Sequence, residues 1–256
     1  MIYIIDALFH VRRELERDVT GRAPRRIIND MLATQAGDVN IWCWDGAGAK
    51  KRRQAIFPAY KSKRLPHPDN IWPMVNLLRE GLAFTPSVQI TVPTYEADDV
   101  IATIVRAYPV TNKHIRSQDR DLSQLFDGHT SADFTTELPP DDVRLYKTLV
   151  GDASDNIPGV KLFGQKGWAQ LTPQTKHQLK AAFNGGDARV VAMTAEQLPT
   201  AATRNWLGEV SNAVEALKMW EIVGLYTIPE DEMTRHMVVG QKNQAKANAL
   251  LEQYLL

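Results

Sequence analysis

The sequence contains a single cysteine, Cys43, so it can form neither an internal disulfide nor a zinc site built from several cysteines. Cys43 lies in an apolar run typical of a strand, which favours a buried, unreactive thiol. No apolar run approaches the roughly 18 residues that can span a bilayer. The stretch Met1–Asp6 has no basic segment and reaches an acid too early for a signal peptide. We therefore expect a cytoplasmic protein without membrane contacts.

The chain also lacks net charge, which argues against a general nucleic-acid binder. The distribution of charge is uneven, however. Residues 50–64 contain seven basic side chains and no acid, whereas residues 94–155 contain twelve acids and six bases. A basic segment followed by an acidic one suits a protein that grips phosphates and also holds cations.

The order of apolar runs predicts an α/β fold. We expect strands at 2–5, 39–44, 88–92, 114–117 and 130–134, and helices at 8–15, 27–36, 72–82 and 95–107, the last with Thr94 as its N-cap. This alternation predicts a parallel, twisted sheet flanked by helices. After about residue 140 the strands stop. We expect one helix at 141–150, a second that ends at about 171 and a third that starts at Thr172. Further helices are expected to start at Thr194, where the spacing is that of a capping box, to lie near Ser211 and to run from Gln244 to Leu256.

Acidic side chains stand where the predicted strands end. Asp6, Asp45 and Asp119 each follow a strand, and the helix that carries Glu96, Asp98 and Asp99 begins after another strand. In open α/β sheets this carboxyl edge is where ligands bind, so these acids can converge. Carboxylates that are held together favour a divalent metal. Acids in the first turn of a helix are also favoured by its dipole, which is the plain alternative for the 96–99 group.

Three further acids extend the pattern: Asp121, Asp152 and Asp155. Taken separately, Asp119 and Asp121 could form a turn, Asp152 could cap a helix, and Asp155 could be a solvated loop residue. The predicted metal site would be absent only if all of these alternatives were true together.

Two segments have the composition of DNA contacts. In the basic run, Phe57–Arg64 places Tyr60 among cations, which suits a clamp in which a ring stacks on a base; a solvated loop is the alternative. Between two predicted helices, Gly159–Gly164 permits close approach of a phosphate to backbone N–H groups. A plain helix-to-helix turn is the alternative there.

Three blocks resemble the 5′-nuclease family of 5′→3′ exonucleases and flap endonucleases, which includes the 5′-nuclease domain of DNA polymerase I and stand-alone phage enzymes. The blocks are Tyr95–Ala102, Gln118–Leu125 and Leu149–Val160. The resemblance runs in the same order from Asp6 to about Trp168 and is weak beyond it. It implies a PIN-like nuclease core at 1–140 with an arch or clamp at about 46–70. It also implies a helical DNA-binding module at 141–256, with a helix–three-turn–helix at about 141–171, packed on the core as one compact unit.

Carried over position by position, the resemblance implies two or more Mg²⁺ or Mn²⁺ ions. Their implied ligands are Asp6, Asp45, Glu96, Asp98, Asp99, Asp119, Asp121, Asp152 and Asp155. The division of these acids between the metals stays open. The implied catalytic residues are Tyr60, Lys61 and Arg64, with Lys61 at the scissile phosphate. The implied DNA contacts are Arg53, Lys63, Gly159, Lys161, Gly164 and Lys166, and a K⁺ ion is implied at the helix–three-turn–helix.

Leu162 stands where the family usually has glycine, and Trp168 where it has a small residue, which affects the details of backbone binding. The resemblance implies a monomeric, structure-specific nuclease that cuts 5′ flaps, forks or nicked duplexes, in a bacterial cell or a phage-infected host. A PIN-type ribonuclease and a non-catalytic branched-DNA-binding protein are the alternatives. A phosphatase of the haloacid-dehalogenase type would need an Asp-x-Asp motif after the first strand, which Asp6-Ala-Leu does not supply.

Overall fold

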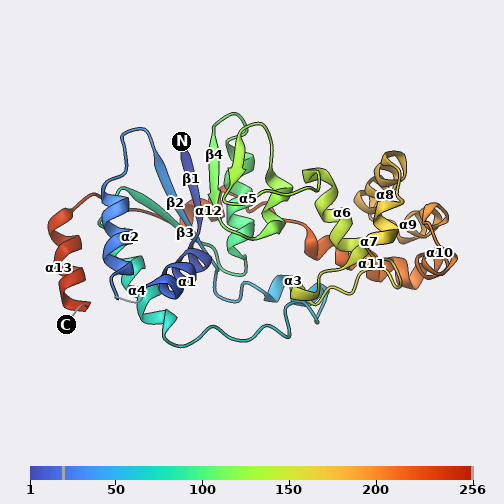
Figure 1. Cartoon of the computed structure of the whole chain (residues 1–256), viewed down its shortest axis with the longest axis horizontal. Helices are drawn as coiled ribbons and strands as arrows, with labels where there is room; N and C mark the ends of the chain where they lie inside the picture. Colours follow the sequence, from blue (N-terminus) through green and yellow to red (C-terminus); the bar gives the residue numbers. More distant parts are fainter. Residues whose placement is uncertain (19–20, 255–256) are drawn as a thin grey trace. The chain divides into compact units, whose positions relative to one another are not determined.

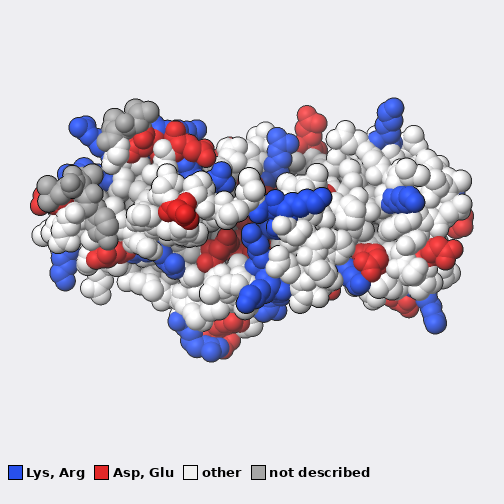
Figure 2. All heavy atoms as spheres, turned by 90° about the horizontal axis from the view of Figure 1, so that it is seen from below, with Lys and Arg blue, Asp and Glu red and all other residues white. Residues whose placement is uncertain are grey.

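The computed structural model describes residues 1–18 and 21–254. These residues form two compact units. Unit 1 contains Met1–Ala49, Pro66–Thr135 and Tyr226–Leu256, and unit 2 contains Lys50–Leu65 and Thr136–Leu225. Figure 2 shows one face, on which both basic and acidic side chains are exposed.

Unit 1 is built on a six-stranded sheet in the order β5-β4-β1-β2-β3-β6 (Figure 1). The strands are β1 (Ile2–Asp6), β2 (Val39–Trp44), β3 (Ser87–Thr91), β4 (Lys113–Arg116), β5 (Thr130–Ala132) and β6 (Met237–Val239). All neighbouring pairs are parallel except β3 and β6, which are antiparallel. The carboxyl ends of β1 to β5 therefore share one edge of the sheet.

Helices cover both faces of this sheet. On one face, α1 (Ala7–Arg17), α2 (Ala23–Leu32), α4 (Ile71–Leu82) and α13 (Gln244–Tyr254) share a core with Ile5, Trp42 and Trp44. Side chains alternate along a strand, so Ile4 and Ile41 face the other way. There α5 (Ala97–Ala107) packs on β1, β2 and β3. The 3-10 helix η1 (Arg120–Leu125) and α12 (Glu230–Arg235) complete unit 1.

Unit 2 is helical. Its elements are α3 (Lys51–Ile56), α6 (Pro140–Val150), η2 (Ala153–Asp155), α7 (Gln165–Ala169), α8 (Pro173–Gly185), α9 (Ala188–Thr194), η3 (Ala195–Gln197), α10 (Ala201–Gly208) and α11 (Val210–Val223). Tyr60 from the basic segment is buried in the same core as Leu149 of α6 and Phe183 of α8. This burial attaches the segment 50–65 to the helices of unit 2.

The predicted α/β class and the five parallel strands are confirmed, and two predicted N-caps differ from the structure. Thr94 has φ 66° and lies before the helix; Glu96 is the N-cap of α5, in a capping box with Asp99. Thr194 is the last residue of α9 and precedes the short 3-10 helix η3, but its side chain makes no capping hydrogen bond. The predicted end of the last helix at Leu256 lies outside the described residues.

The two units divide the chain differently from the predicted boundary at residue 140. The strands do not stop there, because β6 pairs with β3 at Val88↔Val239 and Tyr226–Leu256 belong to unit 1. Residues 50–65, expected in the core domain, belong to unit 2. Within residues 1–18 and 21–254, no helix has both the length and the apolar character needed to cross a membrane.

Gly46 is required where the chain leaves β2. Its N–H donates to the Tyr95 carbonyl at 3.0 Å, and a Cβ on Gly46 would lie 1.8 Å from the Val92 carbonyl oxygen. Only glycine lets these two backbone segments approach so closely beside Asp45.

We predict that Gly46→Ala lowers the free energy of unfolding by about 3 kcal/mol, because the backbone of the Val92 segment must move away. Urea unfolding followed by circular dichroism measures the change. Gly128→Ala is the matched control, since a Cβ there meets nothing within 4 Å. Equal stability of the two variants would contradict this account of Gly46.

Candidate active site

Asp6 and Asp119 are linked through Ser117 at the carboxyl edge of the sheet. Asp6 ends β1 and caps α1, where its Oδ1 accepts the Phe9 N–H at 3.2 Å. The Ser117 hydroxyl donates to Asp6 Oδ2 at 2.9 Å and accepts the Asp119 N–H at 3.1 Å. The edge positions of β1 and β4 thereby hold two carboxylates in fixed relation, as the strand pattern predicted.

Asp45 and the start of α5 meet at the same edge. Asp45 Oδ1 accepts the Ala97 N–H at 2.8 Å. Glu96 is buried at the N-cap of α5, and Asp98 follows in its first turn, half-buried. Burial raises the pKa of the Cys43 thiol, and the carboxylates of Asp6 and Asp98 raise it further. Charges from β1 and from α5 therefore act on the same point of β2.

The electrostatics show that these acids crowd one another. Burial raises the pKa of Asp6 from 3.8 to about 7, against hydrogen bonds from Phe9 and Ser117, and the charges of Asp45 and Asp119 add to the increase. Ionised carboxylates this close are stabilised by a cation. Oxygen donors of this kind suit Mg²⁺ or Mn²⁺ better than zinc. The donor set therefore fits a divalent metal.

Asp99 does not belong to this group. It is fully buried, its Oδ1 accepts the Tyr226 N–H at 2.9 Å and its Oδ2 accepts the Glu96 N–H at 3.2 Å. Its carboxylate ties the returning chain at Tyr226 to the start of α5, which is a structural role. Asp121 lies in the first turn of η1 and donates its N–H to Asp119 Oδ1 at 2.9 Å.

Asp152 and Asp155 belong to unit 2, where each has a basic partner. Lys147 donates to Asp152 Oδ2 at 2.7 Å. Burial alone would raise the pKa of Asp152, but the Lys147 ammonium and Ser154 lower it below its ordinary value. Asp155 is buried and pairs with Arg64 at 2.5 Å and with Lys61 at 3.7 Å.

The catalytic candidates of the basic segment lie beside this loop. The Lys61 N–H donates to the Asp155 carbonyl at 2.9 Å, and the Lys63 N–H donates to Asn156 Oδ1 at 3.1 Å. The Lys61 ammonium lies 4.8 Å from the centre of the buried Tyr60 ring. Unit 2 therefore brings Tyr60, Lys61 and Arg64 together around Asp155.

Arg53 differs from its predicted role as a DNA contact. It is only 3% exposed, and its guanidinium donates to the carbonyls of Ile222 at 2.9 Å and Gly224 at 3.0 Å. These bonds satisfy the carboxyl end of α11. Arg53 thus anchors α3 within unit 2.

The predicted DNA contacts in the hairpin between α6 and α7 are of two kinds, buried and accessible. Gly159 is buried with φ 72°, and a Cβ there would lie 2.6 Å from the Gly151 nitrogen, so this glycine serves close backbone packing. A Cβ at Gly164 meets nothing within 4 Å, and Lys161 and Lys166 are exposed. Leu162 has φ 63°, in the left-handed region, at the position where the resembled family usually has glycine.

Ser117, which joins Asp6 to Asp119, is not among the residues predicted from the sequence. A small hydroxyl residue two positions before a strand-end aspartate was the available signal. The pairing of Lys147 with Asp152 was also missed, although the two lie five residues apart across the end of α6.

Comparison with known proteins identifies the domain that carries the acidic edge. Residues 22–145 match the family described as "5'-3' exonuclease, N-terminal resolvase-like domain". This part of the chain, just under half of it, is therefore similar to the 5′-3′ exonuclease family. The matched residues include Asp45, Glu96, Asp98, Asp119 and Asp121, whereas Asp6 lies before them.

Curated relatives of two kinds, a 5'-3' exonuclease and DNA polymerases I, are similar to this chain. The "5'-3' exonuclease" of Mycoplasma pneumoniae is 28% identical over 209 residues, covering 73% of this chain and 72% of that protein. DNA polymerase I of Caldicellulosiruptor bescii is 36% identical over 168 residues, and that of Thermus thermophilus is 34% identical over 145 residues. The matches to these polymerases span only 20% and 17% of their lengths.

Solved structures resemble the fold over nearly the whole chain. The phage T5 5'-exonuclease with bound zinc has a TM-score of 0.59 at 15% identity, covering 98% of each chain. The T5 D15 flap endonuclease, solved with DNA and metal ions, has a TM-score of 0.56 at the same identity and coverage. At this identity the likeness concerns the fold.

We predict that Asp6→Asn stabilises the metal-free protein at high pH. Between pH about 4 and about 7 the folded state keeps a proton on Asp6 that the unfolded chain has released, so stability falls as pH rises and the loss is complete above about 7. Asparagine titrates nothing and still caps α1. Each pKa unit corresponds to about 1.4 kcal/mol, and screening at this partly exposed residue reduces the total, so we expect about 1–3 kcal/mol in favour of the variant at pH 8.

Urea unfolding in EDTA at pH 4, 6 and 8 measures this difference. Asp38→Asn is the control, because Asp38 pairs with the terminal ammonium of Met1 beside the start of β2. Parallel pH profiles for native protein and Asp6→Asn would rule the explanation out.

Proposed function

We propose that the chain is a metal-dependent 5′→3′ exodeoxyribonuclease and flap endonuclease. The observation that carries the proposal is the convergence of Asp6, Asp45, Asp98 and Asp119 at one sheet edge, with the pKa of Asp6 raised to about 7. The match to the exonuclease family supports it. Nothing in such chemistry requires a covalent nucleophile, and the acids are the reactive groups of this edge.

The metal would be held by the acids of this edge, with Glu96 among them. Bound divalent ions supply an activated water and neutralise charge on the phosphate under attack. The residues themselves fix the oxygens: Ser117 orients Asp6, and the backbone N–H groups of Ala97 and Asp121 orient Asp45 and Asp119. Fixed ligands of this kind lose little freedom when an ion binds. Asp121, Asp152 and Asp155 as further ligands stay a prediction, as do the number of ions and a K⁺ ion at the hairpin.

Lys61 and Arg64 supply positive charge to the substrate in this proposal. In the structure both pair with Asp155, so a DNA phosphate would replace a carboxylate that they already contact. Tyr60 holds the Lys61 ammonium over its ring. Lys63, Lys161 and Lys166 are exposed and suit the backbone of a duplex, and Gly164 leaves its own backbone accessible. A flap, fork or nicked duplex as substrate, a monomeric state and work in the cytoplasm are parts of the same proposal.

We predict that the protein cleaves a 5′-labelled DNA flap in Mg²⁺ and that Asp119→Asn lowers the rate at least about 100-fold, because a fixed ligand of the metal is lost. Gel electrophoresis of the labelled products measures the rate. Asp38→Asn is the matched control, with the same substitution outside the acidic edge, and should cleave as the native protein does.

Two outcomes would replace the proposal. Cleavage of single-stranded RNA with no cleavage of the DNA flap would favour the PIN-type ribonuclease. Flap binding that survives EDTA, with no cleavage in Mg²⁺ or Mn²⁺, would favour a non-catalytic branched-DNA-binding protein.

We also predict that Mg²⁺ raises the melting temperature at pH 8, because a bound cation relieves the repulsion among the acids of the edge. At 100 times the dissociation constant the stabilisation is about 2.7 kcal/mol. Differential scanning fluorimetry with and without 10 mM Mg²⁺ should show a shift in the native protein and in Asp38→Asn, and a much smaller one in Asp119→Asn. A shift of the same size in all three would place the ion elsewhere.

A further inference from the structure

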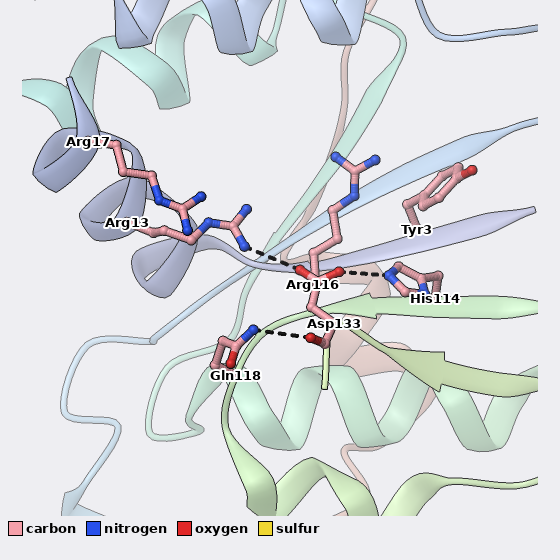
Figure 3. Close-up of a pocket in the computed structure, with 7 residues that line it drawn as sticks. All are labelled: Tyr3, Arg13, Arg17, His114, Arg116, Gln118 and Asp133. Atoms are coloured by element: carbon pink, nitrogen blue, oxygen red, sulfur yellow. Dashed lines mark hydrogen bonds and ion pairs between the residues drawn. The ribbon is translucent and has the colours of Figure 1, made fainter. Parts of the chain in front are cut away.

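A second polar site lies in unit 1 away from the acidic edge. It is a cavity of about 510 Å³ between α1 and the strands β1 and β4 (Figure 3). Tyr3 and His114 are paired neighbours on these strands, and Arg116 follows two residues later on the same face. Arg13 and Arg17 reach the cavity from α1. None of the acids assigned to the metal lines it.

The single acid of this cavity is already satisfied. Figure 3 shows Arg13 and His114 approaching the Asp133 carboxylate from opposite sides, at 3.3 and 2.9 Å. Gln118 donates to the Asp133 carbonyl at 3.1 Å. Arg13 also donates to Nδ1 of His10, a ring that is uncharged near neutral pH because burial lowers its pKa to about 4. Arg13 and Asp133 thus form a fixed wall of the cavity.

Two arginines in the cavity have no such partner. Within residues 1–18 and 21–254, no carboxylate lies within 4.0 Å of the guanidinium of Arg17 or Arg116. Arg116 is held with its guanidinium carbon 4.8 Å from the centre of the Tyr3 ring. Stacking of this kind fixes the plane of the guanidinium and leaves its N–H edge available. Three arginines against one aspartate leave the lining with an excess of positive charge.

We infer that this cavity binds a phosphate ester. Guanidinium groups bind phosphate through paired hydrogen bonds, and Arg17 and Arg116 are the two that are available. Tyr3 adds an aromatic surface beside them. A free mononucleotide and a single nucleic-acid strand both carry this chemistry. The site needs no metal, so its phosphate binding can be tested independently of the proposed nuclease activity.

The test measures binding in EDTA with three probes: inorganic phosphate, thymidine 5′-monophosphate and an eight-residue oligothymidylate. Isothermal titration calorimetry of the native protein should give binding of at least one nucleotide probe. The double substitution Arg17→Gln with Arg116→Gln should weaken it at least about tenfold, because both forks are removed. Arg12→Gln is the matched control, an exposed arginine of α1 that pairs with Glu16 outside the cavity.

Each outcome decides the question. If the double substitution weakens the binding of thymidine 5′-monophosphate and of the oligothymidylate equally, the cavity binds a mononucleotide. If it weakens the binding of the oligothymidylate alone, the cavity binds a nucleic-acid strand. Arg116→Lys keeps the charge without the fork and should recover only part of the affinity. Binding that is absent, or unchanged in the double variant with a native circular dichroism spectrum, overturns the inference. Asp119→Asn should bind these probes as the native protein does, which separates this result from the loss of cleavage.

Discussion

The parallel pairing of strands, which gathers acids at one edge of the sheet, is the constraint on which the candidate site of unit 1 depends. Parallel pairing of β1, β2, β3 and β4 directs the following segments to the same edge, so their acids cannot separate without breaking the sheet. Backbone N–H groups and the Ser117 hydroxyl hold the oxygens in place. The fold supplies the energy that keeps like charges together, and the resulting set of oxygen donors fits a cation.

In unit 2, by contrast, the acids of the predicted site form ion pairs with basic side chains. Asp152 and Asp155 are each paired with a cation of the same unit, so their charges are compensated within it. Tyr60 secures this arrangement because its ring is part of the hydrophobic core while its neighbour Lys61 carries the charge. The basic segment is therefore attached by packing, and its cations are positioned by acids.

Much of this was predictable from local pattern. Apolar runs such as Ile2–Ile5 before Asp6 and Val39–Trp44 before Asp45 identify strands and the acids at their ends from nearby residues alone. Thr94 was a poor guide: threonine is the better N-cap by residue type, but the start of α5 at Glu96 is fixed by distant contacts, of Ala97 with Asp45 and of Asp99 with Tyr226. The strand β6 could not be predicted, since a short exposed segment such as Met237–Val239 is stabilised by pairing with β3 and not by its own composition. Likewise, nothing local distinguishes the buried Arg53 from the exposed lysines around it.

The return of the chain at Tyr226 has a consequence for how the protein is organised. Residues on both sides of unit 2 in the sequence belong to the sheet of unit 1, and the segment 50–65 is a separate excursion into unit 2. The helical unit is thus an insertion in two pieces, not an appendage at the end of a nuclease domain. Removing residues from 226 onward would strip β3 of its antiparallel neighbour and Asp99 of the N–H that it binds. The sheet that positions the acids is complete only when the chain has passed through the helices and come back.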